Sequence, residues 1–328
     1  MQVLTRRLAA LIAEAGYGGG EPVIAGVYGQ GRPPVFAAQG VTGTGEPAGP
    51  DTLAYAASLS KQITAGCAAL LVREGALDME DALAGWLPGL PGWAGTVRLR
   101  HLLFHTAAMP DAQVDAIIGE TADRTSAAVL SALAQIPALT GPPGAAYAYG
   151  GAGYVCLAAA VERAAGQPLP EFAARRIFTP LGMTSTRCWT GPAPAPPGAA
   201  PLAAAHPAPL SLGDGGVWST ARDLLRWGHA LNADELGISP LMQTEGGLDD
   251  GTPVGYAWGM GVRSHAGYRV YRHGGGWPGL RALLARIPDL NQSVVIIALA
   301  DDSERRTGLA AGMLDLVTAR PGVPPDAT

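Results

Sequence analysis

The chain has 328 residues, of which 48% are hydrophobic and 15% are charged, and its formal net charge is −5. This length and composition suffice for one large packed domain or two modest ones. Gly (46) and Pro (28) together stay below the level typical of disordered chains. Because no basic cluster is longer than a pair such as Arg6-Arg7, the charge pattern excludes nucleic acid and anionic membranes as expected partners.

The cysteines predict neither a disulfide framework nor a metal site. Cys67, Cys156 and Cys188 are far apart, with no CxxC and no Cys/His spacing typical of a metal site. We therefore expect free, mostly buried thiols, no metal and no cofactor. At the N-terminus, apolar residues recur at helical spacing over 4–12 and Glu14 interrupts the run, which favours an amphipathic helix over a signal peptide. No apolar stretch approaches transmembrane length, so we expect a cytoplasmic protein.

The hydrophobic pattern predicts strands near both ends of the chain and helices between them. In chain order it predicts the N-terminal helix, strands over 23–31 and 33–43, a helix over 58–74, an Ala/Leu-rich helical stretch over 78–166, a Pro/Ala-rich surface connection over 190–209, a helix that begins after Thr220, four strands over 256–265, 268–275, 280–288 and 293–301, and a last helix over 304–318. The short turns between the late strands favour antiparallel pairing.

A Ser-x-x-Lys pattern stands at the start of the predicted helix over 58–74. Its Lys61 is the only lysine of the chain, and every other basic side chain is arginine. Arginine keeps its proton near neutral pH, whereas a desolvated lysine can release it. The spacing places Ser58 and Lys61 on one helix face, and the helix N-terminus favours negative charge. The pattern predicts a serine nucleophile activated by Lys61; the alternative is a surface lysine beside a capping serine.

Five segments around this pattern resemble the serine β-lactamase family, and more narrowly its class C, esterase and D-aminopeptidase-like branch. They occur in family order at residues 56–65, 97–111, 143–166, 215–231 and 271–289. The resemblance implies an α+β fold of the β-lactamase/transpeptidase type, in which an antiparallel sheet flanked by helices is joined to a mostly helical domain. It also implies a catalytic cleft between the two parts and an acyl-enzyme mechanism.

On this resemblance we assign residues 1–75 and 205–328 to a discontinuous α/β domain and residues 76–204 to a helical domain. The same resemblance makes Ser58 the nucleophile and Lys61 its base.

The second family motif is Tyr-x-Asn followed by Gly-Tyr. Gly153-Tyr154 fixes its register, so Tyr149 takes the place of the tyrosine, with Tyr147 as the alternative. Gly151 stands where the family usually has Asn. That amide would bind a substrate amide and help to hold Lys61, so its loss argues against β-lactamase activity.

The third family motif is Lys-Thr-Gly, or His-x-Gly in esterase-like members, and here it is His273-Gly274-Gly275. The groups that bind the carboxylate of β-lactams are therefore absent. The resemblance places the backbone N–H of Gly276 in the oxyanion hole, with Gly275, Gly151 and Trp277 as neighbouring substrate-binding positions. His273 either contributes to the cleft or is a strand histidine satisfied by the backbone, and Trp277 either lines an acyl pocket or belongs to the core.

Together these residues predict a serine hydrolase that cleaves a small ester, or an amide or peptide bond of a D-configured residue, through an acyl-serine intermediate. Tyr149, hydrogen-bonded to Lys61, would carry the proton to the leaving group. The alternatives are an acyltransferase that uses the same acyl-enzyme, and a non-catalytic relative that only binds such ligands. We expect a small-molecule or D-peptide substrate, with β-lactamase activity weak or absent.

Overall fold

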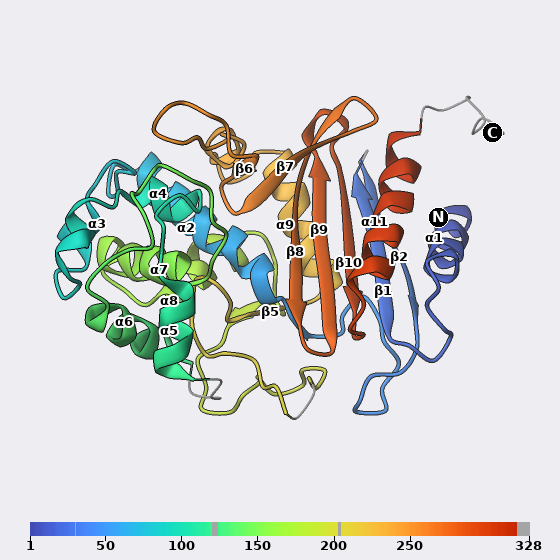
Figure 1. Ribbon diagram of the computed structural model, residues 1–328. Coiled ribbons are helices and arrows are strands. Elements are labelled where there is room, and N and C mark those ends of the chain that lie inside the picture. The colour runs from blue at the N-terminus through green and yellow to red at the C-terminus, as the bar shows by residue number, and fades with distance from the viewer. Residues whose placement is uncertain (30, 120–123, 203–204, 320–328) are drawn as a thin grey trace.

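Seven antiparallel strands form the sheet around which the chain is organised, in the order β2-β1-β10-β9-β8-β7-β6 (Figure 1). This computed structural model describes residues 1–29, 31–119, 124–202 and 205–319. The strands are β1 Val23–Gly29, β2 Arg32–Gln39, β6 Tyr256–Ala257, β7 Met260–His265, β8 Tyr268–Trp277, β9 Leu280–Ile287 and β10 Gln292–Ala298. Strands from the two ends of the chain meet in the sheet, because β1 pairs with β10 over its whole length.

A second, smaller sheet connects the segment before the Ser-x-x-Lys pattern to a later part of the chain. Its strands are β3 Ala54–Tyr55, β4 Arg187–Cys188 and β5 Val217–Ser219, in the order β3-β5-β4. The Ala56 N–H continues this pairing by donating to the Val217 carbonyl at 2.9 Å. The chain that enters the pattern is therefore fixed by backbone hydrogen bonds before the helix begins.

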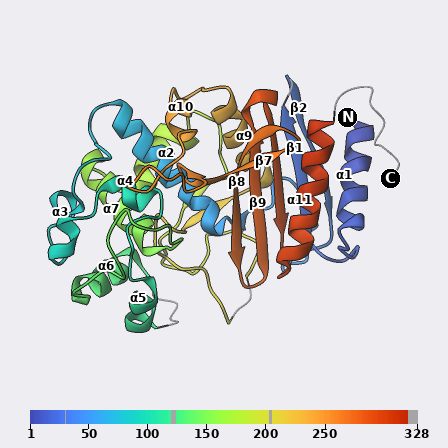
Figure 2. The ribbon, with the colours of Figure 1, turned by 45° about the horizontal axis from the view of Figure 1, so that its top comes forward.

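The helices divide into two groups: α2 to α8 gather at one end of the molecule, and α1, α9 and α11 cover the faces of the large sheet (Figures 1 and 2). The α-helices are α1 Gln2–Glu14, α2 Ser60–Arg73, α3 Leu83–Trp86, α4 Leu99–Leu103, α5 Asp111–Ile118, α6 Ser126–Gln135, α7 Ala152–Ala165, α8 Leu169–Ala173, α9 Ala221–Asn232, α10 Ser239–Met242 and α11 Ser303–Thr318. Short 3₁₀ and π turns lie at η1 Ala57–Leu59, η2 Gly92–Gly95, η3 Ala174–Phe178 and η4 Pro288–Leu290.

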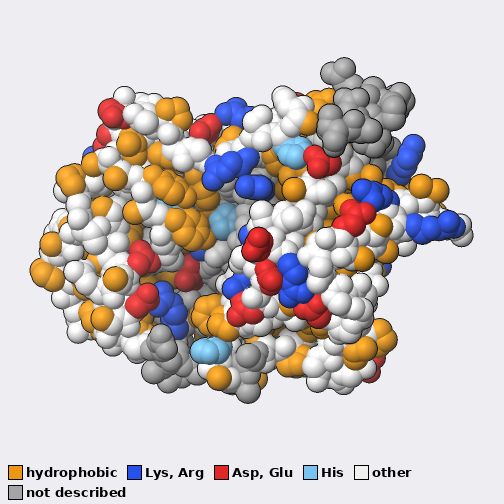
Figure 3. Space-filling view, turned by 45° about the vertical axis from the view of Figure 1, so that its right-hand side comes forward, with side chains coloured by type: hydrophobic (Ala, Val, Ile, Leu, Met, Phe, Trp, Pro, Cys, Tyr) orange, Lys and Arg blue, Asp and Glu red, His pale blue; other side chains and the backbone are white. Residues whose placement is uncertain are grey.

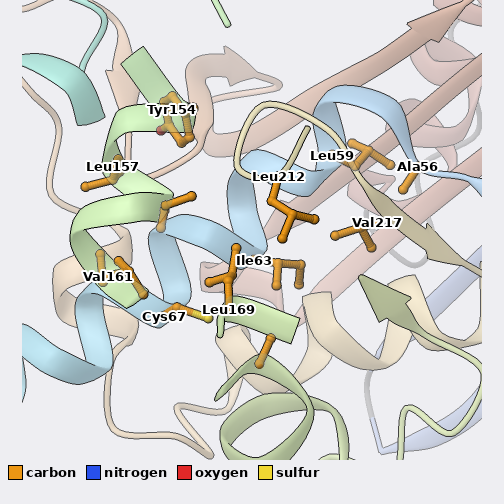
Figure 4. Close-up of a cluster of buried hydrophobic side chains, with 14 of the residues drawn as sticks. Ala56, Leu59, Ile63, Cys67, Tyr154, Leu157, Val161, Leu169, Leu212 and Val217 are labelled. Atoms are coloured by element: carbon orange, nitrogen blue, oxygen red, sulfur yellow. The ribbon is translucent and has the colours of Figure 1, made fainter. Parts of the chain in front are cut away.

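Two separate hydrophobic cores follow from this arrangement. On one face of the sheet, α1 and α11 lie side by side (Figure 2) and bury Leu8, Ile12 and Met313 against Ile296. The larger core lies on the other side, where α2 packs against α7 and the sheet. Figure 4 shows part of it, with Ala56, Leu59, Ile63, Cys67, Tyr154, Leu157, Val161, Leu169, Leu212 and Val217 labelled. Burial of a large apolar side chain of this kind contributes about 1.5–3 kcal/mol.

Most of the predicted elements are confirmed. The N-terminal helix is α1, the two early strands are β1 and β2, and the Thr220 side chain caps α9 by accepting the Asp223 N–H at 3.1 Å. All three cysteines are free, with Cys67 and Cys156 buried. The Pro/Ala-rich connection has no helix or named strand over 190–202, and its residues 203–204 lie outside the described residues.

Two element predictions are wrong in detail. The strand predicted over 256–265 is the hairpin of β6 and β7, which turns at Gly259. Gly259 has φ +75°, and a Cβ there would lie 2.8 Å from the Lys61 carbonyl oxygen, so both the turn and the close approach to α2 require glycine. The helix predicted to begin at Ser58 begins at Ser60, because Ser58 lies in η1.

The antiparallel sheet with flanking helices and a helical end has the α+β architecture that the sequence predicts. The division into domains at residues 75 and 205 stays a prediction. Within the described part of the chain, no helix combines the length and the apolar character that crossing a bilayer requires.

Candidate active site

Ser58 sits at a sharp change of chain direction. Ala57, directly before it, has φ 47°, in the left-handed region that L-residues rarely adopt. This residue turns the chain from β3 into η1 and α2. Ser58 is half-buried and lines a cleft, while every residue from Ser60 to Leu71 is buried. Ser58 is therefore the accessible residue directly before a helix that is held inside the core.

The Lys61 side chain meets Ser58 as the spacing predicts. Lys61 Nζ lies 3.3 Å from Ser58 Oγ and donates to the Asp214 carbonyl oxygen at 3.1 Å. It also faces two aromatic rings, with 4.9 Å to the ring centre of Tyr149 and 5.7 Å to that of Tyr154. Lys61 is only 2% exposed. Its described partners are a hydroxyl, a carbonyl and ring faces, so the nitrogen lies beside the serine without forming an ion pair.

Tyr149 reaches the same cleft from the opposite side, but its hydroxyl contacts a different partner from the one predicted. The hydroxyl lies 3.5 Å from His273 Nε2, whereas Lys61 faces the tyrosine ring. The predicted Tyr149–Lys61 hydrogen bond is therefore wrong for this conformation. Tyr149 lies on the loop before α7 and is 48% exposed, although its ring centre lies 4.4 Å from that of His105. The alternative residue Tyr147 does not line the cleft with Ser58.

His273 is both satisfied by the backbone and turned toward the cleft. Its Nδ1 lies 2.7 Å from the Gly274 carbonyl oxygen, to which it donates, so Nε2 is left as an acceptor for the Tyr149 hydroxyl. Burial, together with the nearby Lys61, lowers the pKa of His273 to about 3. The ring is therefore neutral at physiological pH.

The end of β8 forms the wall opposite α2. Strand β7 pairs with β8 only as far as Arg272, so residues 273–277 have a free edge. Gly275 lies so close to the nucleophile turn that a Cβ there would be 2.5 Å from the Ala56 carbonyl oxygen. Gly276 and Trp277 line the cleft with Ser58, while Trp258 lies in the core. The Trp277 indole N–H donates to the His206 carbonyl at 2.8 Å.

The cleft between these walls has a volume of about 650 Å³. Figure 3 shows a hollow on this face, with a histidine at its floor and basic side chains beside it. Gly151 lies at the cleft just before α7, whose first N–H groups are capped because Asp111 Oδ1 accepts from Gly151 at 2.7 Å and Ala152 at 2.9 Å. The space beside Gly151 holds the Asp214 carboxylate, whose Oδ2 would lie 2.9 Å from a Cβ at that position.

Sequence reasoning missed Asp214. It is far from the motifs in sequence, and its only signal was indirect: the family amide is absent at 151, so another side chain has room there. The site residues that the sequence did predict mostly line this one cleft: Ser58, Lys61, Tyr149, Gly151, Gly276 and Trp277. His273 and Gly275 line the adjoining cavity on the β8 side.

A half-buried serine beside a buried lysine, a free strand edge and a tyrosine is the arrangement expected of a Lys-assisted acyl-serine enzyme. The β-lactamase family model matches residues 8–318. The chain belongs to the β-lactamase family of serine hydrolases, and its fold is the β-lactamase/transpeptidase-like fold that the sequence predicts.

Three curated relatives give this membership more detail. A penicillin-binding protein of Bacillus subtilis is 30% identical over 74% of this chain and 59% of its own length. A D-aminopeptidase of Cereibacter sphaeroides is 30% identical over 73% of this chain and 49% of its own length. The D-alanyl-D-alanine-carboxypeptidase/endopeptidase AmpH of Escherichia coli is 25% identical over 94% of this chain and 87% of its own length. The chain thus spans about half to three fifths of the first two relatives.

Solved structures share the fold across nearly the whole chain. The D-amino acid amidase from Ochrobactrum anthropi SV3, complexed with L-phenylalanine amide, has a TM-score of 0.81 at 21% identity and covers 96% of this chain and 97% of its own. A penicillin-binding protein from Bacillus halodurans has a TM-score of 0.78 at 23% identity, over 94% of this chain and 99% of its own. At these identities the likeness establishes the fold alone.

Proposed function

We propose that this protein hydrolyses an amide or peptide bond of a small D-configured substrate through an acyl-Ser58 intermediate. The observation that carries the proposal is the 3.3 Å approach of Lys61 Nζ to Ser58 Oγ at the floor of the cleft. The relatives' names, a D-aminopeptidase and a D-alanyl-D-alanine-carboxypeptidase, support the amide class. A small ester follows the same steps with an alcohol as the leaving group.

The acylation step transfers one proton from Ser58 to the leaving group. Lys61, in its neutral form, takes the Ser58 proton as Ser58 Oγ attacks the carbonyl carbon. The N–H groups of Ser58 and Gly276 stabilise the oxyanion, and one such donor is worth about 10²–10³ in rate. Tyr149 gives its hydroxyl proton to the leaving nitrogen as the C–N bond breaks. The hydroxyl, which contacts His273 in this conformation, then turns toward Lys61 and regains the proton that Lys61 took from Ser58.

Deacylation runs the same path with water in place of Ser58. Tyr149 and Lys61 remove a proton from water as its oxygen attacks the acyl carbon, and the proton returns to Ser58 Oγ as the acyl bond breaks. The neutral His273 accepts a hydrogen bond from the Tyr149 hydroxyl and so holds that group at the cleft between turnovers.

The test compares two neighbouring serines. Ser58→Ala should remove both turnover of D-alanine p-nitroanilide and the acyl adduct that intact-mass analysis detects with p-nitrophenyl butyrate, a loss on the order of 10⁴-fold or more. Ser60 is the matched control because it is fully buried and its Oγ accepts the Val217 N–H at 3.1 Å. Ser60→Ala should cost about 1–2 kcal/mol of unfolding free energy and keep the adduct.

Retained turnover in Ser58→Ala would refute this assignment. A wild-type protein that forms no adduct with any activated ester would instead favour the non-catalytic ligand-binding alternative. An adduct that is released faster by an added amine or alcohol than by water would identify the acyltransferase alternative.

A further inference from the structure

Among the described residues, three carboxylates line the cleft next to Ser58 and Lys61, and one of them has an oxygen without a hydrogen bond. Asp115 is bonded to Arg124, and Asp111 caps α7. Asp214 differs from both, since its Oδ1 accepts the Ser211 hydroxyl at 2.9 Å while its Oδ2 has no hydrogen-bond partner among the described residues. Burial raises the pKa of Asp214, and the neighbouring Lys61 and Arg124 oppose that rise.

The position of Asp214 changes what the cleft can recognise. Its Oδ2 occupies the space that a side chain at Gly151 would fill. An Asn there would offer an N–H donor to a substrate carbonyl, whereas a carboxylate offers only acceptors. A carbonyl oxygen is repelled at this place, and an ammonium group is attracted. The cleft beside Asp214 is therefore suited to a free amine rather than an acylated one.

A second cavity, of about 250 Å³, lies on the other side of Tyr149 and carries the opposite charge. Arg263, Arg272 and Arg306 line it together with Tyr149 and His273. None of the three arginines forms an ion pair with a described carboxylate. We call Arg263, Arg272 and Arg306 the arginine cluster.

The arginine cluster lacks carboxylate partners among the described residues. Arg263 donates to the Val262 and Gly255 carbonyls, and Arg306 donates to the Ala282 carbonyl at 3.5 Å and the Thr307 hydroxyl at 3.2 Å. The buried Nε of Arg306 and the Arg272 side chain have no hydrogen-bond partner in the described part of the chain. Burial lowers the pKa of Arg272 and of Arg306, and neighbouring arginines lower both further. Like charges held together in a cavity repel, and an anionic ligand that pairs with them relieves that repulsion.

We propose that the cleft binds a short peptide with both ends free, whose ammonium group is received by Asp214 and whose carboxylate is received by the arginine cluster. This inference rests on the acyl-serine function proposed above. In that function Tyr149 gives its proton to the leaving nitrogen, so the cavity beyond Tyr149 is the leaving-group side. Asp214 lies beside Ser58 and Lys61, on the acyl side.

The test measures two variants, each with peptides whose ends are free and with peptides whose ammonium or carboxylate group is chemically blocked. The probes are D-alanyl-D-alanine and tri-D-alanine, each also as the N-acetyl form and as the C-terminal amide, and cleavage is measured as kcat/KM. Asp214→Asn should lower kcat/KM about 10–100-fold for peptides with a free ammonium and reduce the preference over the N-acetyl forms. Arg272→Gln should do the same for peptides with a free carboxylate, judged against the amides.

Two further variants control for loss of charge alone. Asp115→Asn and Arg281→Gln remove charges that line the same cleft region but are already paired, with Arg124 and with Asp301 respectively. Their preference between blocked and unblocked peptides should stay within about threefold of the wild-type value.

Binding to Ser58→Ala, measured by calorimetry with the same peptides, separates this inference from the proposed function. Tight binding that depends on both free termini, without turnover in the wild type, refutes the proposed function and keeps the inference. Terminal preferences that are unchanged in Asp214→Asn and Arg272→Gln overturn the inference, as does the absence of binding by any peptide. If the preference for a free terminus changes in only one of the two variants, the proposal that the cleft recognises both ends of the peptide is wrong.

Discussion

The two walls of the cleft are built differently. The α2 wall carries Lys61 on a helix buried from Ser60 to Leu71, and Ser58 lies on the η1 turn directly before that helix. The facing wall carries Tyr149 on a loop, 48% exposed, with a 3.5 Å hydroxyl contact to His273 and ring contacts to Lys61 and His105. The difference teaches that the core positions Ser58 and Lys61, whereas the Tyr149 hydroxyl is held by one long hydrogen bond on a half-exposed ring.

The largest loss of activity should come from replacing Lys61 on the α2 wall. Lys61→Arg keeps the positive charge but removes a group that can release its proton near neutral pH. We expect kcat to fall on the order of 10⁴-fold, the upper end for a general base, and Lys61→Met to fall as far. Circular dichroism should verify the fold of both variants. If Lys61→Arg keeps a tenth of the activity, the lysine supplies only charge.

The next largest loss of activity should come from disturbing the contact between Gly275 of β8 and the Ala56 carbonyl. Gly275→Ala places a Cβ 2.5 Å from the Ala56 carbonyl oxygen, so β8 must move away from the nucleophile turn. Displacing one oxyanion donor should lower kcat about 10²–10³-fold, measured on an activated ester. Gly276→Ala is the matched control, because a Cβ there meets nothing closer than the Arg281 side chain at 3.8 Å. An equal loss in both variants would contradict this explanation.

Changes on the wall that carries Tyr149 should cause a smaller loss of activity. Tyr149→Phe should lower kcat about 10²-fold, at the lower end for a proton donor, because the exposed site admits water that can replace the hydroxyl. Tyr147→Phe changes the neighbouring tyrosine and should cost less than about threefold, since Tyr147 lies outside the Ser58 cleft. The reverse order of losses would make Tyr147 the proton donor.

The smallest change in activity should come from His273, whose effect appears instead in the pH dependence of stability. Its pKa is about 3 in the folded chain against an ordinary value of 6.5. The unfolded chain therefore binds a proton below pH 6.5 that the folded chain refuses, and stability is lost as pH falls from 6.5 toward 3. Between pH 7 and pH 4.5, the free energy of unfolding measured by urea denaturation should fall in His273→Gln by about 2–3 kcal/mol less than it falls in the wild type.

The exposed His206 provides the control for this measurement. His206→Gln should keep the wild-type loss of unfolding free energy over the same pH interval. If His273→Gln loses as much stability as the wild type, His273 is not the group that the folded chain keeps unprotonated.

The sequence predicted the wall that carries Ser58 and Lys61 better than the facing wall that carries Tyr149, for a physical reason. The contact between Ser58 and Lys61 depends only on their separation of three positions at the start of a helix, which the local sequence shows. The turn at Ala57 carried no signal, because a left-handed alanine is imposed by tertiary packing and not by its propensity. The break at Gly259 was missed because the strand pattern continues across it, and only the approach of α2 reveals why glycine is there. Asp214 was missed because its role depends on the space at Gly151.

The isolation of Lys61 as the sole lysine, with its nitrogen at the cleft, makes the protein its own spectroscopic probe. Reductive methylation with ¹³C-formaldehyde would place labelled methyl groups on this one side chain and on the amino terminus, and nowhere else in the chain. The chemical shift of that methyl resonance would then report the protonation of this one nitrogen as the pH is changed, without any change to the amino-acid sequence.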